Sequence, residues 1–237
     1  MKKTTILFDL DGTLLPMDQD LFTKTYFKEL AIKMAPFGFD PHKLGDNIWA
    51  GVAAMVKNDG GFSNEEAFWT AFSHIYGENV REYSPVFEEF YAKEFQKAQK
   101  VCGFAPQAGE TVRRLKEMGY RVVLATNPIF PAIATQSRIR WTGLEPEDFE
   151  FITTYENSSY SKPNPRYYEE VLEKISCTPA ECLMVGNDVT EDGAAKKIGI
   201  DVFFLTDCLI NQEGRDISGE PHGSWEDLMA YIQGKGE

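Results

Sequence analysis

The chain has 237 residues, 43% hydrophobic and 26% charged, so it can bury a sizeable core as one large domain or one domain with an insertion. Its net charge of −13, without any cluster of lysine or arginine, argues against nucleic acid as the main partner. No apolar run approaches the ~18 residues of a membrane span. The start, "MKKTTILFDLDG", lacks the longer apolar region of a signal peptide.

The four cysteines, Cys102, Cys177, Cys182 and Cys208, form no CxxC pair, and the histidines are scattered. A zinc site is therefore not expected. Four free thiols fit a reducing compartment, so we expect a cytoplasmic protein without membrane contact.

The first part of the chain predicts one strand followed by helices. Residues 4–9 ("TTILFD") form a short apolar run typical of a buried strand. From about 18 to 98 the apolar residues recur at helical spacing, and Ser63 with Glu66 indicates one helix start. We interpret the aromatic stripes of these helices as core faces rather than as a cofactor site.

Strands and helices alternate in the rest of the chain. Predicted strands cover 120–126, 149–154, 181–186 and 201–206, with helical segments between them and a last helix that begins after Ser224. This alternation predicts a parallel sheet with right-handed crossovers. The expected fold is a doubly wound, Rossmann-like α/β domain with helices on both faces (1–16 and 99–237) and an all-helical insertion (17–98) after the first strand.

Polar side chains gather where the predicted strands end. Asp9 and Asp11 follow the first strand, Thr126 and Asn127 the second, and Asn187, Asp188 and Asp192 come after the strand at 181–186. In doubly wound sheets, ligands bind outside the carboxyl ends of the strands, near the point where strand order reverses. Two carboxylates as close as Asp9 and Asp11 repel each other, which indicates a bound cation or a reaction that uses both.

Four motifs carry a resemblance to a known family. "DLDGTLL" (9–15), "LATN" (124–127), "SKPNP" (161–165) and "VGNDVTED" (185–192) occur in this order. Together they resemble the motifs of the haloacid dehalogenase-like (HAD) hydrolases, over about 1–16 and 99–237. The helical insertion resembles the C1-type cap of that family in position and texture.

The resemblance implies a phosphoryl-transfer site that uses Mg²⁺. Asp9 would be the nucleophile, forming an aspartyl-phosphate, and a metal ligand. The backbone carbonyl of Asp11 would be a second ligand, and its side chain would protonate the leaving oxygen and then activate water. A bound Mg²⁺ would offset the repulsion between a carboxylate and a phosphate dianion, which is about 4 kcal/mol per charge pair at ~4 Å and an effective dielectric near 20.

The other motifs would complete the site. Thr126 and Asn127 would bind the transferring phosphoryl oxygens, and Lys162, between stiffening prolines, would neutralise both phosphate and Asp9. Asp188 and Asp192 would hold Mg²⁺ directly or through water. Here the sequence departs from the commonest family form, because Asn187 stands where an acid usually follows the glycine. We assign Asp188 as the shifted ligand.

Asp11 favours phosphate esters within the family, since the dehalogenase and phosphonate-hydrolase branches lack an acid at its position. The expected activity is a phosphatase of small phosphomonoesters. A sugar phosphomutase remains open, and so does a non-catalytic phosphate-ester-binding protein. A phosphorelay receiver is a further alternative, although its acceptor aspartate ends the third strand and no isolated aspartate ends "FEFITT" here.

The insertion is expected to act as a lid that selects the substrate. It enters after Leu15–Pro16 and leaves near Gly103, two short segments suited to hinges. Acids outnumber bases within it, so we expect a small phosphorylated metabolite rather than a polyanion. Lys57 and Asn58 in "KNDGG" are the expected substrate contacts of the lid. The chain is expected to be a monomer or a weak homodimer.

Overall fold

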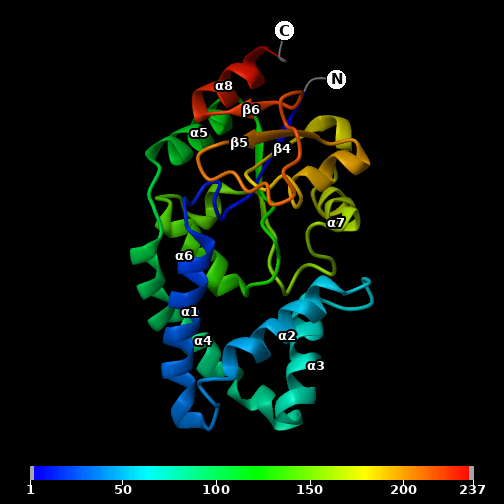
Figure 1. Cartoon of the computed structure of the whole chain (residues 1–237). Coiled ribbons are helices and arrows are strands. Elements are labelled where there is room, and N and C mark those ends of the chain that lie inside the picture. The colour runs from blue at the N-terminus through cyan, green and yellow to red at the C-terminus, as the bar shows by residue number, and fades with distance from the viewer. Residues whose placement is uncertain (1–2, 235–237) are drawn as a thin grey trace.

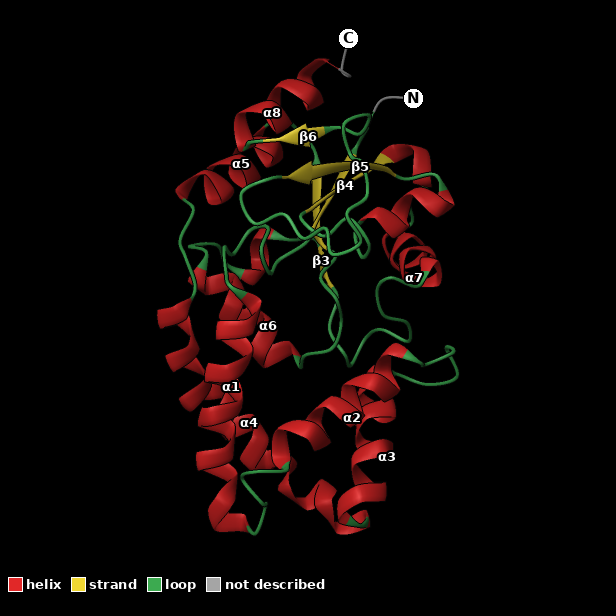
Figure 2. Ribbon diagram, in the orientation of Figure 1, coloured by secondary structure: helices red, strands yellow, loops and turns green. Residues whose placement is uncertain are grey.

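The computed structural model describes residues 3–234. Its centre is a six-stranded, all-parallel sheet in the order β3-β2-β1-β4-β5-β6 (Figure 2). The strands are β1 Thr5–Phe8, β2 Arg121–Leu124, β3 Phe151–Ile152, β4 Cys182–Gly186, β5 Asp201–Leu205 and β6 His222–Gly223. This is the strand order of a doubly wound dinucleotide-type sheet, and the predicted fold class is confirmed.

Helices cover both faces of the sheet because its strands are apolar on both sides. Ile6 and Phe8 belong to one buried cluster, whereas Leu7 belongs to the other. The covering helices are α5 Pro106–Glu117, α6 Ala132–Trp141, α7 Pro165–Ile175 and α8 Trp225–Gly234, with short 3₁₀ turns at Pro146–Asp148, Pro179–Glu181 and Gly193–Ile198. Figure 1 shows α5 and α8 on one side of the sheet and α7 on the other.

The helical insertion lies at the opposite end of the molecule from the chain termini (Figure 1). It contains α1 Gln19–Met34, α2 Leu44–Val56, α3 Asn64–Tyr76 and α4 Ser84–Ala92, with 3₁₀ segments at Ala35–Phe37, Glu78–Tyr83 and Glu94–Val101 (η3). Ser63 caps α3 by accepting a hydrogen bond from the backbone N–H of Glu66 at 3.2 Å, as predicted.

The two connections to the insertion run side by side. Met17 and Cys102 form an antiparallel bridge, and the N–H of Gly103 donates to the carbonyl of Pro16 at 2.7 Å. The boundary predicted at 98/99 lies within η3, close to this bridge at Cys102.

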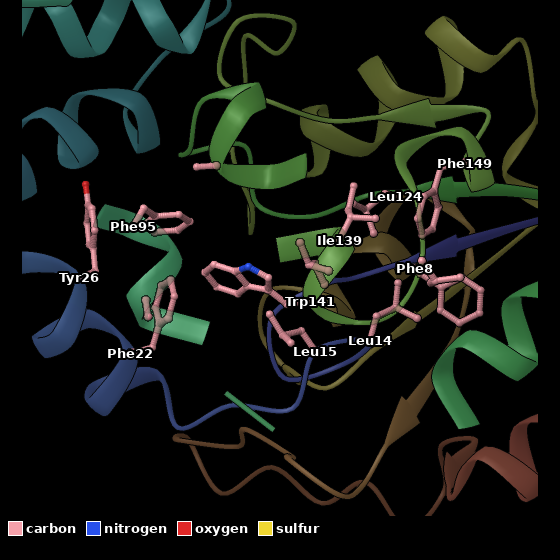
Figure 3. Packing of buried hydrophobic residues seen from close by; sticks show 14 of the residues in the cluster. Phe8, Leu14, Leu15, Phe22, Tyr26, Phe95, Leu124, Ile139, Trp141 and Phe149 are labelled. Carbon is pink, nitrogen blue, oxygen red and sulfur yellow. The ribbon is translucent and has the colours of Figure 1, made fainter. Parts of the chain in front are cut away.

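One apolar cluster continues from the sheet into the insertion. Figure 3 shows Phe8 and Leu14 near the sheet, Trp141 on α6, and Phe95 and Phe22 in the insertion. The rings of Phe95 and Trp141 stack with centroids 5.2 Å apart. Since each buried aromatic side chain contributes roughly 1.5–3 kcal/mol, this contact fixes η3 and its neighbour α1 against α6.

Two elements differ from the sequence predictions. The helical segment predicted between the strands at 181–186 and 201–206 is a 3₁₀ helix over Gly193–Ile198 rather than an α-helix. The strand β6 lies outside the predicted strands, and its residues pair with Phe204 and Leu205 of β5. Among residues 3–234, no helix combines the length and apolar character needed to cross a bilayer.

Candidate active site

The candidate site lies at the carboxyl ends of β1 and β4, the central strands of the sheet. Asp9 follows β1 directly, and its N–H donates to the carbonyl of Val185 at 2.9 Å, which continues the β1–β4 ladder by one residue. The chain leaves β1 toward β2 on one side and reaches β4 on the other, so strand order reverses here. A crevice is expected at such a point, and the predicted acids gather in it.

The turn after β1 is locked to the loop after β4. Gly12 has φ 87°, and a Cβ atom there would lie 2.3 Å from the Asn187 side-chain nitrogen, so only glycine fits. The hydroxyl of Thr13 donates to Asn187 Oδ1 at 2.9 Å and lies 3.3 Å from Asp9 Oδ2. Asn187 therefore holds the first motif in place, and its amide nitrogen donates to the carbonyl of Cys208 at 2.7 Å, a bond that a carboxylate could not make.

Lys162 is the buried cation of the site. Its side chain, 1% exposed, places Nζ 2.9 Å from Asp9 Oδ1 and 2.6 Å from Asp192 Oδ1. Burial lowers the pKa of Lys162, but the charges of Asp192 and Asp9 outweigh it and hold that pKa well above its usual value. Burial raises the pKa of Asp9 to about 7, although Lys162 opposes the rise.

Asp192 contacts both Lys162 and the backbone of the loop after β4. One of its oxygens accepts from Lys162, and the other accepts from the N–H of Asp188 at 2.9 Å. A Cβ atom at Gly186 would lie 2.0 Å from that second oxygen, so the glycine makes room for the carboxylate. Both oxygens of Asp192 therefore have hydrogen-bond partners, and its expected role in holding Mg²⁺, directly or through water, stays a prediction.

Asp188 and Glu191 form the acidic rim beside Asn127. Asp188 Oδ1 accepts from the N–H groups of Thr190 at 2.7 Å and Glu191 at 2.8 Å, bonds that do not use its other oxygen. Asn127 Nδ2 lies 3.1 Å from both oxygens of Glu191, and burial raises the pKa of Glu191 to about 8. Glu191 was not predicted; its only sequence signal is its place beside Asp192 in the fourth motif.

Asp11 is paired with a buried arginine that sequence reasoning missed. Arg138, 0% exposed, forms an ion pair with Asp11 Oδ2, and its guanidinium lies 4.2 Å from the centroid of the Phe130 ring. Asp11 Oδ1 is buried and has no hydrogen-bond partner. Burial raises the pKa of Asp11, and Arg138 opposes the rise. An arginine within a helix is ordinarily exposed, so nothing in the sequence marked Arg138 for this pairing.

Thr126 and Asn127 take their predicted places after β2. The Asn127 side-chain oxygen accepts from the N–H of Lys162 at 3.2 Å, which ties the second motif to the third. The carbonyl of Thr126 accepts from the hydroxyls of Tyr167 at 2.8 Å and Thr153 at 2.7 Å. The backbone is thus fixed where a phosphoryl group would be held.

A cavity of about 340 Å³ joins these groups to the insertion. Asp9, Asp11, Thr126, Asn127, Asp188 and Asp192 all line it, together with Asn187 and Glu191. Lys162 lies behind Asp9 and is not a lining residue, so its charge acts on the cavity through that carboxylate. The structure brings every predicted core residue to this one place.

Lys57 and Asn58 are not brought to the cavity. Asn58 is buried, and its side-chain amide donates to the carbonyl of Phe62 at 2.9 Å and to Asn64 Oδ1 at 3.0 Å. Lys57 is exposed. The polar groups of this loop satisfy one another, which leaves no amide for a substrate. Their expected substrate contact therefore gains no support.

The donors of the site fit a hard divalent cation such as Mg²⁺. They are carboxylate oxygens of Asp9 and Asp188 and a backbone carbonyl at Asp11, and the unpartnered Asp11 Oδ1 and the raised pKa of Asp9 indicate missing positive charge. Among residues 3–234, no three His, Cys, Asp or Glu side chains are grouped as a complete metal site. Mg²⁺ does not require that, since it usually takes one or two carboxylates, substrate oxygens and water.

Comparisons with known proteins agree with this geometry. The family model described as haloacid dehalogenase-like hydrolase matches residues 3–199. A phosphoglycolate phosphatase of Vibrio vulnificus is 28% identical over 204 residues, 85% of this chain and 82% of that protein. The pyrophosphatase PpaX of Bacillus velezensis is 25% identical over 196 residues, 83% and 80% of the two chains. A HAD phosphatase structure from Thermococcus onnurineus shares the fold, with a TM-score of 0.56, 19% identity and 99% of each chain covered.

Proposed function

Because the chain belongs to the haloacid dehalogenase-like hydrolases and acts on phosphate esters, we propose that it is a phosphatase of small phosphomonoesters that works through an aspartyl-phosphate on Asp9. The family resemblance carried by the four motifs is confirmed by the match over residues 3–199. The observation that carries the mechanism is the contact of Asp9 with Lys162 at 2.9 Å at the floor of the cavity.

Asp9 attacks phosphorus in this mechanism, and the ester oxygen leaves with its bonding electrons. Lys162 keeps a positive charge next to the nucleophile, which favours its ionised form as the phosphate dianion approaches. Thr126 and Asn127 line the same cavity, where a hydroxyl and an amide can donate to the phosphoryl oxygens. Water then attacks the phosphorus of the aspartyl-phosphate, which releases phosphate and restores Asp9.

Asp11 supplies and removes the protons in this scheme. Its carboxyl group gives a proton to the leaving oxygen and later takes one from the attacking water. The ion pair with Arg138 disfavours the protonated form that a general acid needs, whereas burial raises the pKa of Asp11, so we propose that Asp11 exchanges this partner for the substrate oxygen during turnover.

We propose Mg²⁺ as the cofactor, held by Asp9, the carbonyl of Asp11 and Asp188. When bound, it supplies positive charge that offsets repulsion between the carboxylate and the phosphate. We further propose that residues 17–102 are a cap domain that admits the substrate and excludes water. A cytoplasmic location and a monomeric or weakly dimeric state remain predictions from the sequence.

The alternative activities gain less support. A receiver module of the phosphorelay type has the strand order 2-1-3-4-5, which differs from the order found here. A sugar phosphomutase must bind several hydroxyl groups, whereas the insertion side of the cavity is largely aromatic and aliphatic. The phosphatase is therefore the better reading of the site.

Phosphate release tests the proposal directly. The wild type should release phosphate from an aryl phosphate with Mg²⁺ and lose that activity with a chelator. Asp9→Asn keeps the size of the side chain but removes the anionic nucleophile, so turnover should be abolished while the circular dichroism spectrum is unchanged. Wild-type turnover in that variant would refute the covalent mechanism.

A further inference from the structure

The insertion side of the cavity is a wall of apolar side chains. It is formed mainly by Phe22, Tyr26 and Phe27 of α1, Ile48, Trp49, Val52 and Val56 of α2, Phe68 and Trp69 of α3, and Phe87 and Tyr91 of α4, with Gln19 and Thr23 at the start of α1 as its polar members. Within this wall, Trp49 is 48% exposed and Val56 43% exposed. Large apolar side chains exposed beside a cavity mark a place where an apolar group is received.

The charges around the cavity are all of one sign. Its charged lining residues, among those that the structure describes, are carboxylates: Asp9, Asp11, Asp188, Glu191 and Asp192. The two nearby cations do not line the cavity: Lys162 is buried against Asp9 and Asp192, and Arg138 is buried against Asp11 and the Phe130 ring. A second anionic group on a substrate would therefore lose its hydration without gaining a partner.

Some polar groups of the wall already form hydrogen bonds with one another. The hydroxyls of Tyr26 and Tyr91 lie 2.9 Å apart and bond to each other. Burial raises the pKa of Tyr26 to about 12, so its hydroxyl stays neutral. A polyhydroxylated leaving group would find few donors or acceptors on this side of the cavity.

From this wall and this charge pattern, we propose that the substrate is the phosphate monoester of an uncharged apolar or aromatic alcohol, with its apolar part seated between α1, α2 and α3. The inference rests on the proposed phosphatase activity and specifies its substrate class. It also separates this chain from its relatives, whose names specify phosphoglycolate and pyrophosphate, two substrates that carry a further anionic group. Val52 lines the wall and is not one of the catalytic groups, so its substitution can test the substrate class.

The test compares benzyl phosphate with 4-carboxybenzyl phosphate, which share a leaving-group type and differ by one carboxylate. The wild type should favour benzyl phosphate in kcat/KM by about 10- to 100-fold, since the added anion must be desolvated without a partner. Phosphoglycolate and pyrophosphate should be poorer still. Val52→Lys should shrink the ratio, whereas Ala53→Lys, an exposed neighbour on α2 that does not line the cavity, should leave it unchanged.

Inhibition of the wild type supplies a second readout that needs no variant. Benzylphosphonate should inhibit at a concentration at least ~10-fold lower than 4-carboxybenzylphosphonate. If the carboxylated ester or phosphoglycolate is cleaved as well as benzyl phosphate, the substrate class is wrong while the phosphatase stands. If no ester is cleaved with Mg²⁺, the proposed function fails and this inference fails with it.

Discussion

Replacing Lys162 with methionine removes the buried cation and keeps most of the side-chain volume. The ammonium lies 2.9 Å from Asp9 and 2.6 Å from Asp192. At an effective dielectric near 20, each contact attracts by about 6 kcal/mol, but desolvation of three buried charges offsets much of this. Removing one partner of such a group typically costs about 3–5 kcal/mol, because the remaining charges stay buried.

The loss in Lys162→Met should be limited by proton uptake. Without the ammonium, the pKa of Asp9 rises further above about 7, so a proton replaces the lost positive charge at neutral pH. That proton also removes the anionic nucleophile. We therefore expect a loss of about 3 kcal/mol in the free energy of unfolding together with at least a 10²- to 10³-fold loss in kcat.

Urea unfolding followed by circular dichroism measures the stability change, and phosphate release measures kcat. Lys93→Met is the matched control, since Lys93 forms an ion pair at 2.7 Å with Glu89 but its side chain is 66% exposed. It should change the unfolding free energy by less than about 0.5 kcal/mol. If Lys162→Met also changed the unfolding free energy by less than about 0.5 kcal/mol, the reasoning about the buried cation would be refuted.

Three further predictions follow from the same site. Asp11→Asn should slow hydrolysis of an alkyl phosphate by about 10²- to 10⁴-fold. Hydrolysis of an aryl phosphate should slow much less, because a phenolate leaving group scarcely needs a proton. Equal losses in kcat for the two esters would count against Asp11 as the general acid. Asp188→Asn should raise the Mg²⁺ concentration for half-maximal activity more than Asn187→Ala does, and the reverse order in metal titrations would shift the ligand by one residue. Without metal, the raised pKa values of Asp9 and Glu191 stabilise the fold only while these groups are protonated, so the thermal midpoint should fall between about pH 5 and pH 8. Mg²⁺ should raise the thermal midpoint more at about pH 8 than at about pH 5. An equal rise at the two pH values would contradict carboxylates as the metal ligands.

The sequence was sufficient for the fold and for the core of the site. Short apolar runs bounded by turn residues located β1, β2, β3, β4 and β5 to within two residues at every end. Three of the four motifs lie at strand ends, and parallel strands bring such ends together, so Asp9 and Asn127 could be placed near each other without a structure. The sequence places Asp192 at the site, but its contacts with Lys162 and with the N–H of Asp188 are visible only in the folded loop.

The sequence could not predict which residues pair over long range, or which polar side chains already have hydrogen-bond partners within the protein. Arg138 lies on a helix with buried residues all around it, so no periodicity distinguishes it from an exposed arginine. Asn58 was expected to face a substrate because its loop is polar and rich in glycine. A polar loop can equally satisfy itself, and the bonds to Phe62 and Asn64 show that this one does. The two-residue β6 carries no pattern of its own and depends on its pairing with β5.

The central claim is that Asp9 carries the phosphoryl group. The most direct test is to mix enzyme, Mg²⁺ and an aryl phosphate, quench in acid during turnover, and locate the modification by peptide mass spectrometry after borohydride reduction. The account predicts a phosphorylated peptide that contains Asp9, conversion of residue 9 to homoserine on reduction, and neither in Asp9→Asn. Turnover without any phosphorylated residue, or with the phosphoryl group on Asp11 or Asp188, would contradict it.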